Sequence, residues 1–249
     1  MMRVIVNGIG GTMGKVLYNA LNSHAEAKAV AGVDKYADPS KFDIPVYDDI
    51  SKVKEEADCI IDFSVKEALP GILAYAAEKK LPCVLATTGY GEKELALVKE
   101  ASEKIAIFRS GNMSVGVSTL VKLVKSAAAI LYNADVEIVE QHHHNKVDAP
   151  SGTALLLADA VKTARKDLVN VYGREGIVGK RKPEELGIHA VRGGSIVGKH
   201  EVMFIMNNEV VTLKHEAENK GIFAEGAIRA GLFLLTCPPG QYDMQDLTA

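Results

Sequence analysis

The chain has 249 residues, of which 47% are hydrophobic and 24% charged, and this composition is typical of a globular protein with one large or two modest domains. The formal net charge is -3, and we find no run of about 18 apolar residues. Neither nucleic acid nor a membrane is therefore an expected partner. The three cysteines, Cys59, Cys83 and Cys237, have no CxxC spacing, which favours a cytoplasmic protein over a disulfide framework or a zinc site.

The first half of the chain alternates short β-type runs with helical patterns. Strands are predicted at residues 3–7, 27–34, 58–64, 82–88 and 105–108. The first is followed by a helix with apolar residues at positions 13, 16, 17, 20 and 21, and further helices are predicted at 67–80 and 92–104. This alternation predicts an α/β fold with a doubly wound parallel sheet.

The second half has a different pattern. A long helix is predicted at residues 114–131, a strand at 135–141, a helix at 151–166, and three β-type runs at 188–192, 200–205 and 209–213. Asn207 and Asn208 suggest a tight hairpin turn with positive φ. We expect an α+β domain with a mixed, largely antiparallel sheet. A final helix at 223–235 suggests that the chain returns to the first domain, with the domain changes near residues 113 and 222.

A glycine-rich turn follows the first strand: Gly8, Ile9, Gly10, Gly11, Thr12, Met13 and Gly14. Glycines allow close backbone approach, and the helix that follows offers free N–H groups to a pyrophosphate. Asp34 ends the second strand and could accept a hydrogen bond from a ribose hydroxyl. A turn that serves only packing is the alternative, but strand, helix and acidic residue in register favour a dinucleotide site. Lys35 could meet a 2′-phosphate, so the choice between NADH and NADPH stays open.

Residues 140–154 carry the densest chemistry of the chain and allow three interpretations. His142 and His144 share one face of a strand and could ligate a metal, but a third ligand is not evident, so we expect none. A solvated polar loop is the second interpretation. The favoured one is an acid/base and anion site, in which Ser151 caps a helix. The N–H groups around Gly152 and Thr153, at the start of this helix, would then bind a carboxylate. Lys146 and His143 would add charge to the same pocket. His142 could exchange protons near neutral pH.

The sequence resembles the 4-hydroxy-tetrahydrodipicolinate reductase (dihydrodipicolinate reductase) family over nearly its whole length. The segment from Glu140 to Ala154 matches the family pattern E-x-H-H-x-x-K-x-D-A-P-S-G-T-A. Further matches are the glycine turn, residues 86–89, 110–114 and 192–200, and the terminal G-x-[YF]-D-M-x-D pattern at residues 240–246.

The resemblance implies reduction of 4-hydroxy-tetrahydrodipicolinate with NADH or NADPH in lysine and diaminopimelate biosynthesis. It implies a Rossmann-type dinucleotide-binding domain at residues 1–112 and 222–249, and a substrate-binding and oligomerisation domain at 113–221 that forms a homotetramer. His142 and Lys146 would be catalytic. The dicarboxylate substrate would be bound by His143, Gly152 and Thr153, with Ser151 nearby. The cofactor would be lined by Gly8, Ile9, Gly10, Gly11, Thr12, Met13, Asp34, Ala86, Thr87, Thr88, Ser110, Gly111, Asn112 and Met113.

Two positions depart from the family pattern. Thr12 and Lys220 stand where the family often has arginine, and both changes touch cofactor contacts, so a strict preference for NADPH is not expected. Two other functions remain alternatives: a dehydrogenase of another small carboxylate, and a nucleotide-sensing protein without turnover. Neither requires the histidine-lysine segment together with Ser-Gly-Thr, so that segment favours the reductase.

Overall fold

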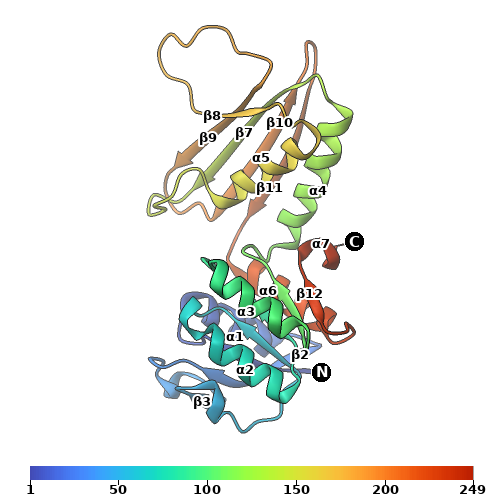
Figure 1. Cartoon of the computed structure of the whole chain (residues 1–249). Coiled ribbons are helices and arrows are strands. Elements are labelled where there is room, and N and C mark those ends of the chain that lie inside the picture. The colour runs from blue at the N-terminus through green and yellow to red at the C-terminus, as the bar shows by residue number, and fades with distance from the viewer. Residues whose placement is uncertain (249) are drawn as a thin grey trace. The chain divides into compact units, whose positions relative to one another are not determined.

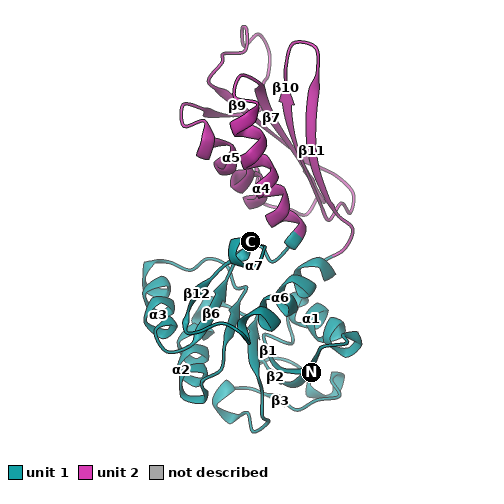
Figure 2. Ribbon diagram, turned by 90° about the vertical axis from the view of Figure 1, so that its right-hand side faces the viewer, with its two compact units in different colours: residues 1–115, 220–249 teal, residues 116–219 magenta. Residues whose placement is uncertain are grey.

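The computed structural model describes residues 1–248, which form two compact units (Figures 1 and 2). Unit 1 comprises residues 1–115 and the chain from Lys220 onward, and unit 2 comprises residues 116–219. Within residues 1–248, every helix is too short or too polar to span a lipid bilayer.

Unit 1 contains a parallel seven-stranded sheet. Its strands are β1 (Met2–Asn7), β2 (Ala27–Val33), β3 (Val46–Tyr47), β4 (Cys59–Asp62), β5 (Cys83–Leu85), β6 (Ala106–Arg109) and β12 (Gly240–Tyr242). Their spatial order is β12-β6-β5-β4-β1-β2-β3. The chain therefore runs outward from β1 in one direction to β3 and in the other to β6 and β12. This is the doubly wound order of dinucleotide-binding folds, with its reversal point between β1 and β4.

Helices cover both faces of this sheet, as the alternating pattern predicted. On one face α1 (Thr12–Ser23) packs beside α6 (Gly221–Leu234), and on the other α2 (Leu69–Lys79) packs beside α3 (Glu92–Ser102). Each face has its own apolar core, the first around Leu17 and Phe108 and the second around Ile72. Cys59 and Cys83 lie in these cores with no exposed surface.

The last part of the chain belongs to unit 1. Helix α6 contacts β4, β5 and β6, strand β12 pairs with β6 in parallel, and α7 (Met244–Leu247) follows. Gly226 on α6 lies against the carbonyl oxygen of Met113, where any Cβ would overlap it. The glycine therefore lets the helix approach the segment that leaves β6.

Unit 2 contains a mixed five-stranded sheet, in the order β11-β10-β7-β9-β8. The strands are β7 (Asp135–His142), β8 (Val169–Tyr172), β9 (Glu185–Arg192), β10 (Gly198–Ile205) and β11 (Val210–Ala217). Strand β10 pairs antiparallel with β7 and β11, whereas β9 pairs in parallel with β7 and β8. Helices α4 (Val115–Ile130) and α5 (Gly152–Ala164) pack on one face, over an apolar core that includes Val136, Ile138 and Phe204.

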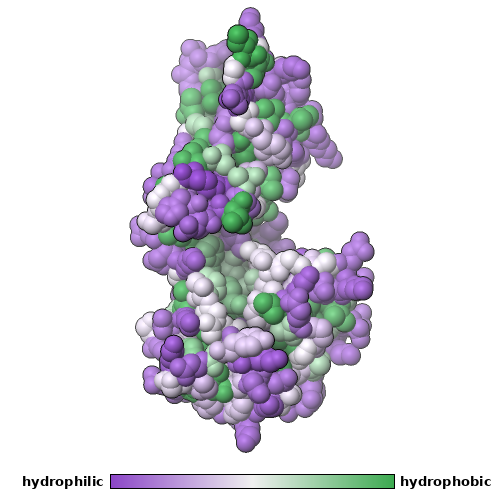
Figure 3. Space-filling view, turned by 90° about the vertical axis from the view of Figure 1, so that its left-hand side faces the viewer, coloured by the Kyte–Doolittle hydropathy of each residue, from purple (hydrophilic) through white to green (hydrophobic). Residues whose placement is uncertain are grey.

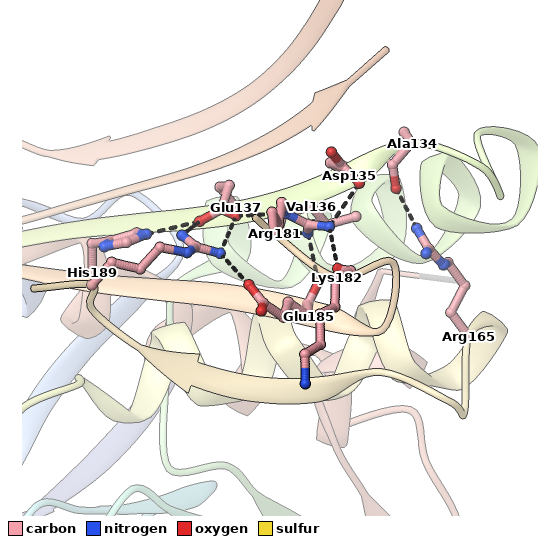
Figure 4. A network of polar contacts seen from close by, with 10 residues as sticks. Ala134, Asp135, Val136, Glu137, Arg165, Arg181, Lys182, Glu185 and His189 are labelled. Carbon is pink, nitrogen blue, oxygen red and sulfur yellow. Dashed lines mark hydrogen bonds and ion pairs between the residues drawn. The ribbon is translucent and has the colours of Figure 1, made fainter. Parts of the chain in front are cut away.

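Alternation along β7 places Glu137 on the face of the sheet away from α4 and α5. Its carboxylate is hydrogen-bonded by Arg174, Arg181 and His189, and Figure 4 shows this network beside the strand. Gly187 lies directly opposite on β9, where a Cβ would overlap the carboxylate.

The structure also corrects details of the sequence prediction. Neither Asn207 nor Asn208 has positive φ; the Met206 N–H donates to the Glu209 carbonyl (2.9 Å) and closes the hairpin without it. The helix predicted at 67–80 begins as a short 3-10 helix, Lys66–Ala68, and becomes α-helical at Leu69, immediately before Pro70. Strands β3, β8 and β12 were not predicted.

Candidate active site

The glycine turn after β1 is shaped by close backbone contacts. Gly8 has φ +79°, and a Cβ there would lie 2.8 Å from the carbonyl oxygen of Phe63 at the end of β4. A Cβ at Gly14 would overlap the Gly8 carbonyl oxygen. The turn can therefore be built only from glycine at these two positions. Gly11 then stands at the N-cap of α1, with no side chain over the N–H groups of the first turn.

Asp34 lies against this turn. Its Oδ2 accepts a hydrogen bond from the Gly10 N–H (3.0 Å), and its Oδ1 accepts one from the Tyr36 N–H (2.9 Å). A Cβ at Gly10 would come within 2.9 Å of Oδ2, so the absence of a side chain lets the carboxylate approach. Lys35 lies beside it, with Nζ 5.7 Å from the centre of the exposed Tyr36 ring.

The other predicted cofactor residues follow the carboxyl ends of neighbouring strands. Residues 86–88 follow β5 and residues 110–113 follow β6, at the same edge of the sheet as the glycine turn. Thr88 is exposed, whereas Ala86, Thr87 and Met113 are buried. Ser110 donates to the Asn112 carbonyl (2.8 Å). The side chain of Ile9 lies in the core, so only its backbone can face a ligand.

Sequence reasoning missed a buried carboxylate at this edge. Asp62 ends β4 with no exposed surface and accepts hydrogen bonds from Asn7 Nδ2 (2.8 Å), Ser64 Oγ (2.5 Å) and Thr87 Oγ1 (2.7 Å). It therefore ties together the ends of β1, β4 and β5. An aspartate at the end of an otherwise apolar strand was the available signal.

In unit 2, Ser151 caps α5 as predicted. Its Oγ accepts a hydrogen bond from the Ala154 N–H (3.2 Å) and lies 2.9 Å from Nε2 of the buried His200. Burial and the charge of the neighbouring His142 lower the pKa of His200 to about 4, so its imidazole stays neutral at physiological pH. Gly152 and Thr153 form the first turn of the capped helix.

His142 ends β7 beside this helix start. Its Nδ1 lies 2.6 Å from Oε2 of Glu140, which has no exposed surface. Arg192 binds the same carboxylate through both terminal nitrogens, at 2.8 and 2.6 Å, and the Ser151 N–H donates to it at 3.0 Å. Neither Glu140 nor Arg192 was among the predicted site residues.

The loop after β7 carries the remaining charged residues. Lys146 Nζ forms an ion pair with Asp148 at 2.7 Å, and its backbone N–H donates to the His143 carbonyl. Nδ1 of His143 is buried without a hydrogen-bond partner in the structure. His144 is exposed whereas His142 is buried, so these two histidines do not share an environment. Residues 1–248 contain no cluster of three potential metal ligands.

Comparisons with known proteins give the family of the chain. Residues 2–113 match the family model described as dihydrodipicolinate reductase, N-terminus, and residues 116–248 match dihydrodipicolinate reductase, C-terminus. A 4-hydroxy-tetrahydrodipicolinate reductase of Caldanaerobacter subterraneus subsp. tengcongensis is 51% identical over 248 residues, 99% of this chain and 98% of the relative. One of Clostridium tetani is 44% identical over 98% of this chain and 96% of the relative.

Solved structures give the same fold. A dipicolinate-bound dihydrodipicolinate reductase from Paenisporosarcina sp. TG-14 matches with a TM-score of 0.81 at 22% identity, covering 98% of this chain and 97% of the other. The family models together span almost the whole chain, and the relatives match it along nearly their full length. The chain therefore belongs to the dihydrodipicolinate reductase family.

Proposed function

We propose that the chain reduces 4-hydroxy-tetrahydrodipicolinate with NADH or NADPH, in the cytoplasmic biosynthesis of diaminopimelate and lysine. Family membership carries the reaction class. The observation in unit 2 that best supports this activity is the set of groups at the ends of β7 and α5: an imidazole bonded to a buried carboxylate, a capped helix start, and a lysine in the loop between them.

The residues of unit 1 fit a dinucleotide. Gly8 and Gly14 leave room at the glycine turn, the uncovered start of α1 suits a pyrophosphate, and Asp34 stands where a ribose hydroxyl would bind. Thr12, Met13 and residues 86–88 and 110–113 surround the same edge of the sheet. When bound, the reduced nicotinamide supplies a hydride. Lys35, next to Asp34, can meet a 2′-phosphate, so we expect both cofactors to be used, with NADH at least as good.

The groups of unit 2 suit a substrate with two carboxylates. The backbone N–H groups at Gly152 and Thr153 open a 13-residue helix whose cap is fixed by Ser151. His143 adds a buried nitrogen with unused hydrogen-bonding capacity. Together they would hold one carboxylate and thereby fix the orientation of the substrate ring.

Lys146 and His142 supply the acid/base chemistry. Reduction of a conjugated imine leaves an electron-rich ring carbon that must gain a proton. The Lys146 ammonium can donate that proton and offset the developing negative charge. Asp148 forms an ion pair with the Lys146 ammonium at 2.7 Å and thereby limits its orientation. His142 can assist as an acid or as a proton relay.

A coupled assay tests this function. Pyruvate and aspartate semialdehyde are condensed in place by a synthase, and loss of reduced-nicotinamide absorbance is followed with NADH and, separately, with NADPH. We expect Lys146→Met to lower kcat on the order of 10²-fold or more, as for a lost general acid. Lys166→Met, which changes an exposed lysine just beyond α5, is the control. A near-normal kcat in Lys146→Met would move the proton donation to His142 or to solvent.

Self-association into a tetramer is part of the proposal. Helices cover only one face of the five-stranded sheet of unit 2, and the other face carries partly exposed apolar residues: Val139, Val191, Met203 and Ile205. Further exposed apolar side chains, Tyr172, Ile177 and Val178, lie on β8 and in the loop after it. Figure 3 shows one side of the molecule, on which hydrophobic residues (green) lie among hydrophilic residues (purple) at the surface. Sedimentation equilibrium would give a molecular mass four times that of one chain if the proposal holds, and the mass of a single chain if the protein does not self-associate.

A further inference from the structure

Glu140 is a carboxylate with every hydrogen-bonding direction in use. It lies on β7, the central strand of its sheet, and has no exposed surface. Oε1 accepts hydrogen bonds from Arg192 Nη2 (2.6 Å) and the Ser151 N–H (3.0 Å). Oε2 accepts one from Arg192 Nη1 (2.8 Å) and lies 2.6 Å from His142 Nδ1.

These contacts keep the carboxyl ionised. Burial by itself would raise the pKa of Glu140, but hydrogen bonds from Arg192, His142 and the Ser151 N–H outweigh it and lower that pKa below its usual value. An ionised carboxylate can only accept hydrogen bonds. His142 must therefore carry a proton on Nδ1, and in the neutral imidazole Nε2 is the basic nitrogen.

Gly198 makes room for that second nitrogen. It precedes Lys199, which pairs with Gln141 of β7, and a Cβ at Gly198 would lie 3.1 Å from Nε2 of His142. The neighbouring His200 ring packs edge-on against His142, at 5.1 Å between ring centres, and is itself neutral at physiological pH. The imidazole of His142 is thus oriented by its neighbours on β7 and β10, with Nε2 on the side of Gly198.

Glu140 also reaches the other two parts of the candidate site. Through the Ser151 N–H it holds the residue that caps α5, and so the first turn at Gly152 and Thr153. Arg192, which it binds with two hydrogen bonds, donates in turn to the Asp148 carbonyl (2.8 Å) in the loop that carries Lys146. One side chain thus connects the histidine, the helix start and the lysine loop.

We propose that Glu140 is a positioning residue for the reductase reaction, holding His142 with its proton on Nδ1 and Nε2 available for proton exchange, and fixing Arg192 and Ser151 around it. The effect of Glu140 on turnover rests on the proposed function. The position of the proton on His142 is a property of the protein alone and can be tested without turnover.

Glu137 distinguishes this role from a merely stabilising one. It lies on the same strand, is also buried, and is also bound by arginine and histidine, but it faces the other side of the sheet. Losing either carboxylate should lower stability. Only loss of the Glu140 carboxylate should change which ring nitrogen of His142 carries the proton.

The experiment combines nitrogen NMR with kinetics. Long-range proton–nitrogen correlation spectra of histidine-labelled protein, recorded where the imidazoles are neutral, report which nitrogen carries the proton; a His142→Gln variant assigns the signal among the seven histidines. We expect the Nδ1–H form in the wild type. In Glu140→Gln an amide NH₂ can face Nδ1, so we expect a shift to the Nε2–H form and a kcat lower on the order of 10²-fold or more, with KM changed less. Glu137→Gln should keep the wild-type signal.

Each result decides the proposal. An Nε2–H form of His142 in the wild type overturns it even if Glu140→Gln does not fold. An unchanged tautomer in Glu140→Gln, or a kcat within about twofold of wild type, also overturns it. If the wild-type protein has no reductase turnover, the proposed function fails, while the NMR comparison still decides whether Glu140 sets the protonation of His142.

Discussion

Replacing Glu137 by glutamine measures how much a buried charge network stabilises unit 2. The Glu137 carboxylate accepts two hydrogen bonds from Arg174, both at 2.9 Å, one from Arg181 at 3.1 Å, and contacts His189 Nε2 at 2.8 Å. Its side chain is only 12% exposed, so these groups replace water around the charge. Glutamine keeps the shape of the side chain over Gly187 but removes the charge.

The pKa of Glu137 gives the expected size of the stabilisation by this network. Burial would raise it, but the hydrogen bonds from Arg174, His189 and Arg181 lower it from 4.5 to about 2. At about 1.36 kcal/mol per pKa unit, this shift corresponds to about 3 kcal/mol of folding free energy. Because the pKa is lower in the folded state, the contribution is complete well above pH 4.5, the unfolded value, and is lost as the pH falls through about 2.

The assay is urea unfolding followed by circular dichroism over a pH series, at fixed protein concentration because self-association would change the apparent stability. We expect Glu137→Gln to lower the free energy of unfolding by about 3 kcal/mol near neutral pH, with the difference shrinking in acid. Glu201→Gln, which alters a partly exposed carboxylate on the same face of β10, is the control. A loss below about 1 kcal/mol, or one that does not depend on pH, would refute the reasoning.

Three further outcomes follow from the candidate sites. Ser151→Ala should lower the free energy of unfolding by about 1–2 kcal/mol because the α5 cap is lost, measured by urea unfolding; an unchanged midpoint would exclude a stabilising cap. Gly14→Ala should abolish dinucleotide binding in calorimetry, because its Cβ overlaps the Gly8 carbonyl, whereas Gly71→Ala, in open space on α2, should bind normally. Asp34→Ala should weaken NADH binding by roughly 1–3 kcal/mol, and an unchanged calorimetric affinity would remove Asp34 from the site.

Local patterns in the sequence were enough to predict most of unit 1. Strand β1, the glycine turn and α1 are adjacent in sequence, and their apolar spacing follows from the period of each element. The missed strands are short and lie at sheet edges: β3 has two residues and β12 has three. Their formation depends on a partner strand that is already in place, such as β6 for β12, so the local pattern carries little signal.

The partners of the buried carboxylates could not be predicted in the same way. Glu140 and Arg192 are far apart in sequence and meet because β7 and β9 pair in parallel, with His142 directly opposite Arg192. This register is set by packing over the whole sheet. A signal for Glu140 was nevertheless present in the sequence. It follows Val136 and Ile138 at a spacing of two residues, so it lies on the same side of β7, which faces the helices. A carboxylate at such a position must be buried, and it therefore requires partners.

The partners of the two buried carboxylates on opposite faces of β7, Glu137 and Glu140, have different consequences for the protein. Glu137 and Glu140 are both bound by arginine and approached by a histidine nitrogen, so each charge is compensated locally. Around Glu137 the hydrogen-bond partners of the carboxylate are the side chains of Arg174, Arg181 and His189. Around Glu140 the partners lead on to a helix cap and to the loop that carries Lys146. Desolvation costs are similar for both carboxylates, since both are buried. The first network can thus be explained by stability alone, whereas the second also fixes where His142 holds its proton.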